Sequence, residues 1–144
     1  MFIKQLSVFV ENKAGRLADI TRILADNAIN ILALSIADTT DFGILRLIVE
    51  DPEKALTVLK ENNLMVKTTD VIAISITHTP GSLSTVLKKL DDAGVAIEYM
   101  YDFSNRSKGQ DPMIILRLNN QDKALEALKA SGVTILSSDV VKNL

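Results

Sequence analysis

Apolar and polar residues alternate along two stretches of the chain that lie 66 positions apart. The apolar positions of these stretches are equivalent: Leu6, Val8 and Val10 in the first, and Ile72, Ile74 and Ile76 in the second. A period of two is typical of a β-strand with one buried face. The sequence therefore predicts the same strand twice.

A short polar loop, a glycine and a helical pattern follow each of these strands. The glycines are Gly15 and Gly81, which set the offset of 81 − 15 = 66. Beyond them, apolar residues recur at spacings of three and four: Leu17, Ile20 and Leu24, then Leu83, Val86 and Leu90. This spacing predicts an amphipathic helix in each copy. The repeat continues into a second helix, because "EKALTVL" resembles "DKALEAL".

Each copy is predicted to run strand, helix, strand, strand, helix, strand. We expect strands near residues 2–10, 30–37, 43–50, 64–68, 70–77, 96–103, 113–118 and 133–140, and helices near residues 15–27, 52–62, 81–93 and 121–130. Asp51 is expected to cap the second helix, which Pro52 opens. This order is the ferredoxin-like α+β arrangement, with an antiparallel sheet and helices on one face.

The repeat predicts two domains, residues 1–69 and 70–144, joined by the linker "KTTD" at residues 67–70. The second strand of the first copy, "INILALSIA", is apolar on both faces, with Ile31 and Ala33 expected on one side and Leu32, Leu34 and Ile36 on the other. We therefore expect a sheet of the other copy or of a second chain to cover the helix-free face. An exposed strand is the alternative.

The composition of the chain argues against several classes of function. Hydrophobic residues make up 47% of the chain and charged residues 24%, which is typical of a folded globular protein. A net charge of −2 without long charged runs gives no electrostatic reason to bind nucleic acid or a membrane. Cysteine is absent, so thiolate metal sites and disulfides are excluded. We expect a cytoplasmic protein without cofactor or metal.

Residues that could support catalysis are scarce. His78 is the only histidine, and no nucleotide-binding glycine motif is present. His78 is expected to be a loop residue that bonds nearby backbone, and we predict no catalytic residues and no enzyme. The hairpin from Phe103 to Pro112, with Arg106 and Lys108, is expected to be either a mobile tip or a loop that closes over a ligand.

The two glycine loops are the candidate ligand sites. A helix N-terminus exposes N–H groups and a positive dipole end, which together suit a carboxylate, and glycine allows close approach. Asn12 adds an amide that both donates and accepts hydrogen bonds. Asn30 opens the next strand, and we expect its amide at the same end of the sheet. Both asparagines could instead serve only the turn and the helix end.

The paired loops "ENKAGRL" and "THTPGSL", followed by "NAINI" and "AGVAI", resemble ACT domains in tandem over nearly the whole chain. The resemblance implies a regulatory module that binds an amino acid or another small ligand at domain interfaces. The family's loop asparagine falls on Asn12 and its second asparagine on Asn30, whereas copy two has His78 and Ala96. We expect ligand contacts from Asn12, Lys13, Ala14, Gly15, Arg16, Leu17, Asn30, His78, Pro80, Gly81, Ser82 and Leu83.

The resemblance also implies side-by-side pairing of domains, and we expect a homodimer that regulates through assembly or through a metabolic enzyme. Two arrangements are open. If the two copies pair, Asn12 lies beside Ala96 and the His78 loop lies beside Asn30. If two chains pair through their first copies, Asn12 and Asn30 meet across the dimer. Two alternatives share the element order: an RNA-binding RRM-like protein and a ferredoxin-like enzyme. The third strands, "FGILRLIV" and "MIILRL", carry aliphatic residues where RRM domains carry exposed aromatic residues.

Overall fold

The computed structural model describes residues 2–38, 41–103 and 111–144. The chain forms two compact units. The N-terminal unit comprises Lys4–Thr69 with Asn143, and the C-terminal unit comprises Met1–Ile3, Asp70–Lys142 and Leu144. Residues 104–110 of the long hairpin, including Arg106 and Lys108, lie outside the described residues. The division into domains 1–69 and 70–144 stays a prediction.

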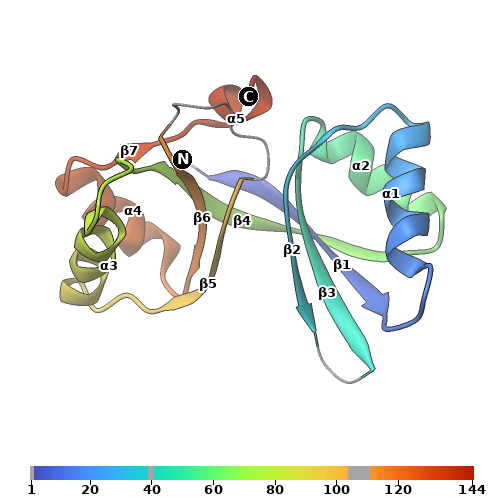
Figure 1. Cartoon of the computed structure of the whole chain (residues 1–144), viewed down its shortest axis with the longest axis horizontal. Helices are drawn as coiled ribbons and strands as arrows, with labels where there is room; N and C mark the ends of the chain where they lie inside the picture. Colours follow the sequence, from blue (N-terminus) through green and yellow to red (C-terminus); the bar gives the residue numbers. More distant parts are fainter. Residues whose placement is uncertain (1, 39–40, 104–110) are drawn as a thin grey trace. The chain divides into compact units, whose positions relative to one another are not determined.

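The N-terminal unit contains β1 (Ile3–Glu11), α1 (Arg16–Asp26), β2 (Ile31–Asp38), β3 (Phe42–Val49), α2 (Pro52–Glu61) and the first part of β4 (Met65–Ser75). Its strands follow the order β2-β3-β1-β4, and β3 is antiparallel to both β1 and β2. Figure 1 shows α1 and α2 together on one face of these strands. The arrangement is the predicted ferredoxin-like sheet.

The C-terminal unit repeats this plan with the rest of β4, α3 (Ser82–Asp92), β5 (Ile97–Asp102), β6 (Met113–Leu118), α4 (Gln121–Ala130) and β7 (Thr134–Ile135). β6 lies between β4 and β5 and is antiparallel to both, while β7 pairs with β4 through Ile74 and Ile135. A short helix, α5 (Ser138–Lys142), follows. The predicted α+β fold with two ferredoxin-like units is therefore confirmed.

Each unit has its own core, built as the alternation predicts. In the N-terminal unit the alternate strand residues and the α1 stripe bury together: Leu6, Val8, Val10, Ile20, Leu24, Leu45 and Leu47. In the C-terminal unit the equivalent residues do so: Ile72, Ile74, Val86, Leu90, Leu116 and Leu128. Leu17 departs from the pattern, because its position in the first turn of α1 leaves it 39% exposed.

Two predicted elements are wrong. The segment expected as a linker, residues 67–70, lies inside β4, which runs without a break from Met65 to Ser75. The strand expected over residues 133–140 is reduced to β7, and α5 takes its second half. The hydroxyl of Ser137 accepts a hydrogen bond from the backbone N–H of Val140 at 3.2 Å, which favours this helix start.

The face assignment in β2 is also corrected. A register irregularity lies between Ile31 and Ala33, so Ile31 pairs with Val49 while Ala33 pairs with Ile48. Ile31 packs against the helix-covered core, and Ala33 lies on the opposite face. The two residues were predicted to share a face. That another sheet covers the helix-free face stays a prediction.

Candidate functional site

The two glycine loops have the same backbone conformation at the helix start. Gly15 has φ 89° and precedes α1, and Gly81 has φ 88° and precedes α3. This left-handed region favours glycine strongly over other residues. A Cβ built on either glycine would meet no atom within 4 Å. Glycine is therefore required here by the backbone, and the space beside it is open.

The helices that follow these glycines begin without a side-chain cap. Neither Gly15 nor Gly81 can cap its helix, and in the described part of the chain the N–H groups of Leu17, Ala18, Leu83 and Ser84 have no hydrogen-bond partner. By contrast, Asp51 accepts from Lys54 N at the start of α2, and Asn120 accepts from Lys123 N at the start of α4, both at 3.1 Å. In each unit, the helix after the glycine loop is uncapped and the next helix is capped.

A hollow of about 260 Å³ lies beside the first glycine loop, and we call it the loop hollow. It brings together four of the predicted site residues, namely Asn12, Lys13, Arg16 and Leu17, with Val10, Glu11, Ile36 and Gly43. Ala14 and Gly15 form the turn but do not line the hollow. The residue after β1, Asn12, is fixed by its N–H, which donates to the carbonyl of Asp41 at 2.9 Å.

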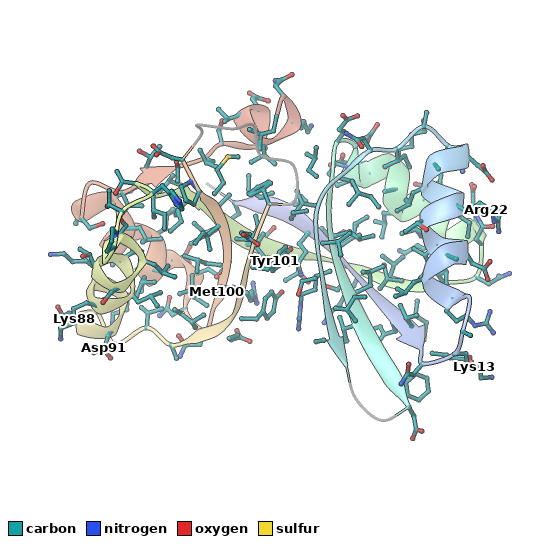
Figure 2. The ribbon with its side chains drawn as sticks, in the orientation of Figure 1. Lys13, Arg22, Lys88, Asp91, Met100 and Tyr101 are labelled. Atoms are coloured by element: carbon teal, nitrogen blue, oxygen red, sulfur yellow. The ribbon has the colours of Figure 1, made fainter. Side chains whose placement is uncertain are left out.

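Three charged side chains line the loop hollow, and the two cations lie at different distances from the one carboxylate. Lys13 Nζ lies 3.1 Å from Glu11 Oε2, whereas Arg16 Nη2 lies 3.9 Å from the same oxygen. The hydrogen bond and charge of Lys13, with a smaller effect of Arg16, hold the pKa of Glu11 below its usual value. Figure 2 shows Lys13 in the loop that leads into α1. The loop hollow therefore combines an ionised carboxylate with two cations.

The second glycine loop has a hollow of about 460 Å³ with different chemistry. All the site residues predicted for this loop line it: His78, Pro80, Gly81, Ser82 and Leu83. Three hydroxyls lie within hydrogen-bond distance of one another, with Ser82 Oγ 2.6 Å from Thr77 Oγ1 and 2.7 Å from Thr79 Oγ1. Hydroxyls thus replace the charged side chains of the first loop, so the two candidate sites are unequal.

Asn30 does not lie where we expected it. Its amide donates to Glu50 Oε1 at 3.2 Å, next to the C-terminal end of β3, whereas Asn12 lies beside Asp41, next to the start of β3. The eight residues of β3 separate these positions by roughly 25 Å. The reason is topological: α1 carries the chain back along the sheet, so β2 starts at the far end. Within one unit, Asn12 and Asn30 cannot contact one ligand.

The far end of the C-terminal unit contains an asparagine that the sequence comparison missed. Ala96 replaces the second asparagine there, and its N–H donates to the side-chain oxygen of Asn119 at 3.0 Å. Asn119 takes the place that Glu50 has in the first unit, since the backbones also pair, Asn119 N with Ala96 O and Glu50 N with Asn30 O. The second half of the repeat aligns at an offset of 69, and this offset places Asn119 opposite Glu50, since 119 − 50 = 69. That alignment was a usable signal for an asparagine at this end of the unit.

Other residues of the hollows were also missed by the sequence reasoning. Glu11, Thr77 and Thr79 line them, although they were not among the predicted ligand contacts. Glu11 ends a strand two residues before Lys13, and that spacing of opposite charges was a usable signal. Ile36 and Gly43 come from β2 and β3 and carry no local signal. Only the folded sheet places them beside the loop.

The described residues offer neither a cluster of three or more metal-ligating side chains nor a helix long and apolar enough to cross a membrane. These hollows therefore present polar backbone groups, one amide, one imidazole, hydroxyls and a few charged groups. Such groups suit the reversible binding of a small polar molecule.

The fold and the loops define a tandem ferredoxin-like module with ligand-sized hollows at its helix starts. The chain belongs to the ACT domain pair family, whose sequence profile matches residues 1–143. The resemblance seen in the loops is thereby confirmed. ACT domains are regulatory domains, which favours this class over the RNA-binding and enzymatic alternatives.

Solved structures share the fold. Protein BT0572 from Bacteroides thetaiotaomicron is 46% identical with a TM-score of 0.93, and the match covers 100% of this chain and 98% of that one. The ligand-free regulatory subunit of aspartate kinase from Thermus thermophilus has 15% identity, a TM-score of 0.63 and 90% coverage of both chains. The corresponding subunit from Thermus flavus has 14% identity, a TM-score of 0.59 and coverage of 90% and 92%. Among curated proteins, none matches the chain significantly.

Proposed function

We propose that this protein is a stand-alone regulatory module that binds a free amino acid at its glycine loops and signals through assembly or a partner enzyme. The observation that carries the proposal is the contrast between helix starts. Asp51 and Asn120 cap α2 and α4, whereas α1 and α3 leave first-turn N–H groups unpartnered beside open hollows. A ligand carboxylate would supply the missing acceptor.

The loop hollow offers partners for both ends of a zwitterion. The N–H groups of Leu17 and Ala18 would receive the carboxylate, with the positive end of α1 behind them. The ammonium group would lie near Glu11 or the amide oxygen of Asn12. Leu17 and Ile36 provide apolar contact for a side chain, because they line the hollow and are 39% and 48% exposed.

Regulation follows in this proposal from a ligand that contacts two domains. Asn12 and Asn30 lie at opposite ends of their sheet, so a ligand held by both must bridge two chains. Such a ligand stabilises the paired arrangement by its differential affinity and shifts the population toward it. We therefore propose a cytoplasmic homodimer whose assembly responds to the amino acid.

A thermal-shift screen against the twenty amino acids tests the proposal. A ligand that binds only the folded state raises the melting temperature, by mass action, as its concentration passes its Kd. We expect one amino acid or a small chemically related group to do so. An unchanged melting temperature with all twenty, in a sample with a cooperative transition, would refute amino-acid binding.

Sedimentation of the same sample tests the assembly step separately. With the amino acid present, the proposal expects a larger fraction of dimer at a given protein concentration. Amino-acid binding without any change in sedimentation would retain the ligand site but reject assembly as the signal.

A further inference from the structure

A second hollow of about 480 Å³ lies in the N-terminal unit, beside α1 and the start of β4. We call it the α1–β4 hollow and define it by the residues Phe9, Ile20, Ile23, Phe42, Leu64 and Met65. Glu11 and Arg16 line both this hollow and the loop hollow. Its volume is that of a site for a small organic molecule.

The α1–β4 hollow is lined by apolar side chains together with charged residues and asparagines, and several of the apolar side chains are unusually exposed. Ile20 is buried, but Phe9 is 40%, Phe42 56% and Met65 71% exposed. Among the described residues, five of the eight exposed large apolar side chains line either this hollow or the loop hollow. Exposed apolar surface gathered around a concavity is typical of a ligand site.

Arg16 gives the hollow an available cation. Its guanidinium lies 3.9 Å from Glu11, which is too far for a hydrogen bond, and Lys13 is the closer partner of that carboxylate at 3.1 Å. No other interaction of the Arg16 side chain occurs among the described residues. The planar guanidinium is therefore ion-paired with Glu11 without donating a hydrogen bond, and its N–H groups can bind a ligand carboxylate through two parallel hydrogen bonds.

Arg22 also lines the hollow, but unlike Arg16 its guanidinium donates a hydrogen bond to a carboxylate of the same helix. Its Nη1 donates to Asp26 Oδ2 at 3.3 Å, and its Nη2 lies 4.0 Å from Asp19 Oδ1. Figure 2 shows Arg22 on α1, farther along the helix from the loop that carries Lys13. The two arginines thus form a matched pair, one engaged within its helix and one available to a ligand.

We propose that the α1–β4 hollow binds an aromatic or branched aliphatic carboxylic acid, with its apolar group among Phe9, Phe42 and Met65 and its carboxylate on Arg16. The rings of Phe9 and Phe42 favour stacking with a flat group of the ligand. Glu11 and Asp19 lie close by, so a doubly charged anion would meet more repulsion than a single carboxylate. This site goes beyond the amino-acid site and does not depend on it.

The test is a ¹H–¹⁵N NMR titration of the full chain with 3-phenylpropionate and, separately, with its neutral amide. We expect the amide signals of Ile20, Leu64 and Met65 to move with the acid. The neutral amide should bind about tenfold more weakly or worse, because it lacks the charge-assisted hydrogen bonds to the guanidinium. No movement of these signals, or equal binding of acid and amide, would overturn the proposal.

Three variants assign the contacts, and all change exposed side chains, so each spectrum also reports that the fold is retained. Met65→Ser should weaken binding of acid and amide alike. Arg16→Gln should abolish the preference for the acid, whereas Arg22→Gln should preserve it. A preference that survives Arg16→Gln, or that disappears with Arg22→Gln, would exclude Arg16 as the carboxylate partner.

A fourth variant separates this site from the proposed amino-acid site. Asn12 lines the loop hollow and not the α1–β4 hollow. Asn12→Ala should therefore leave 3-phenylpropionate binding within about twofold of the original protein, and Met65→Ser should leave amino-acid binding likewise unchanged. If Asn12→Ala abolished 3-phenylpropionate binding, the α1–β4 hollow would not be a separate site.

Discussion

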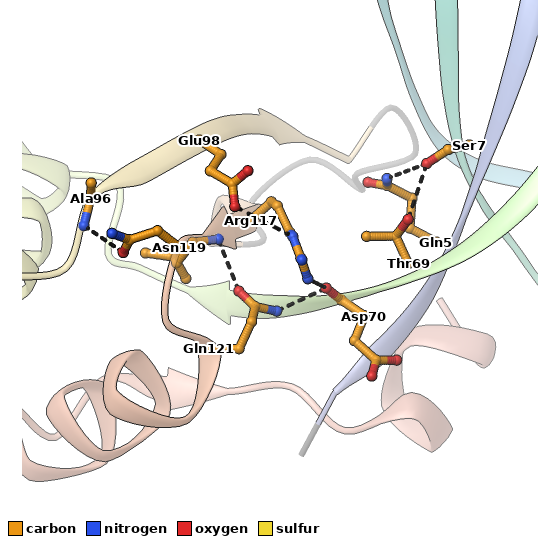
Figure 3. Close-up of polar contacts among 10 residues, drawn as sticks. Gln5, Ser7, Thr69, Asp70, Ala96, Glu98, Arg117, Asn119 and Gln121 are labelled. Carbon is orange, nitrogen blue, oxygen red and sulfur yellow. Dashed lines mark hydrogen bonds and ion pairs between the residues drawn. The ribbon is translucent and has the colours of Figure 1, made fainter.

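Arg117 and Gln121 hold the same backbone oxygen, the carbonyl of Asp70. Arg117 Nη1 donates to it at 2.7 Å and Gln121 Nε2 at 2.8 Å, as Figure 3 shows. Gln121 also accepts from Leu118 N at 2.9 Å through its side-chain oxygen. The first residue of the C-terminal unit in β4 is thereby fixed to β6 and α4. Gln121, the first residue of α4, thus bonds both the end of β6 and the carbonyl of Asp70 in β4.

The substitution Gln121→Met should destabilise the protein. Two hydrogen bonds disappear: the N–H of Leu118 loses its acceptor, whereas the carbonyl of Asp70 keeps only its bond from Arg117, and we expect a loss of about 1–3 kcal/mol in the free energy of unfolding. Chemical denaturation measures this loss. Glu126→Met, on the exposed face of the same helix, is the control and should change stability by less than about 0.5 kcal/mol. Equal effects of the two variants would mean that the network contributes little.

Alanine in place of Gly15 should destabilise the fold through backbone strain. The left-handed conformation, with φ 89°, costs an L-residue roughly 1–2 kcal/mol, and no steric clash adds to this cost. Gly81→Ala should behave alike, since its φ is 88°. Asparagine, which tolerates this region better, should cost less at both positions. A gain in stability by Gly15→Ala in thermal denaturation would show that the loop adopts another conformation.

Asn12→Ala should weaken amino-acid binding while changing stability little. Its backbone N–H bond to Asp41 does not depend on the side chain and remains in the variant, so the turn keeps this anchor. The side-chain amide, which lines the loop hollow, is lost. Isothermal calorimetry should show at least about a tenfold rise in Kd, and denaturation an unchanged midpoint. A lower midpoint with unaltered affinity of the folded fraction would identify Asn12 as a turn residue.

Lys13→Gln should raise the pKa of Glu11 toward its ordinary value of 4.5, because Lys13 is the main cause of its lowering. Arg16→Gln should raise that pKa by less. Because the pKa of Glu11 is lower in the folded state, the ionised carboxylate stabilises the fold. This stabilisation is present above pH 4.5 and is lost as the pH falls through the pKa that Glu11 has in the folded state. NMR titration of the Glu11 carboxyl carbon measures both variants. A larger effect of Arg16→Gln would place that guanidinium closer to Glu11.

Local patterns in the sequence determined the elements and their order. The alternation at Leu6, Val8 and Val10 and the helical spacing at Ile20 and Leu24 specify which faces can be buried, because a strand repeats every two residues and a helix every 3.6. Asp51 capped α2 as predicted, since a cap depends only on its own first turn. The internal repeat then fixed the ferredoxin-like order twice.

Tertiary structure decided what depends on residues far apart in the chain. The path of α1 along the sheet placed Asn30 a full strand length from Asn12, and no local pattern reports that distance. Pairing across β3 brought Ile36 and Gly43 to the first glycine loop and moved Ile31 and Ala33 onto opposite faces. The sequence by itself determined the glycines that leave two helix starts uncapped. Only the fold decided which side chains surround them, because sheet register and topology juxtapose residues that local spacing cannot relate.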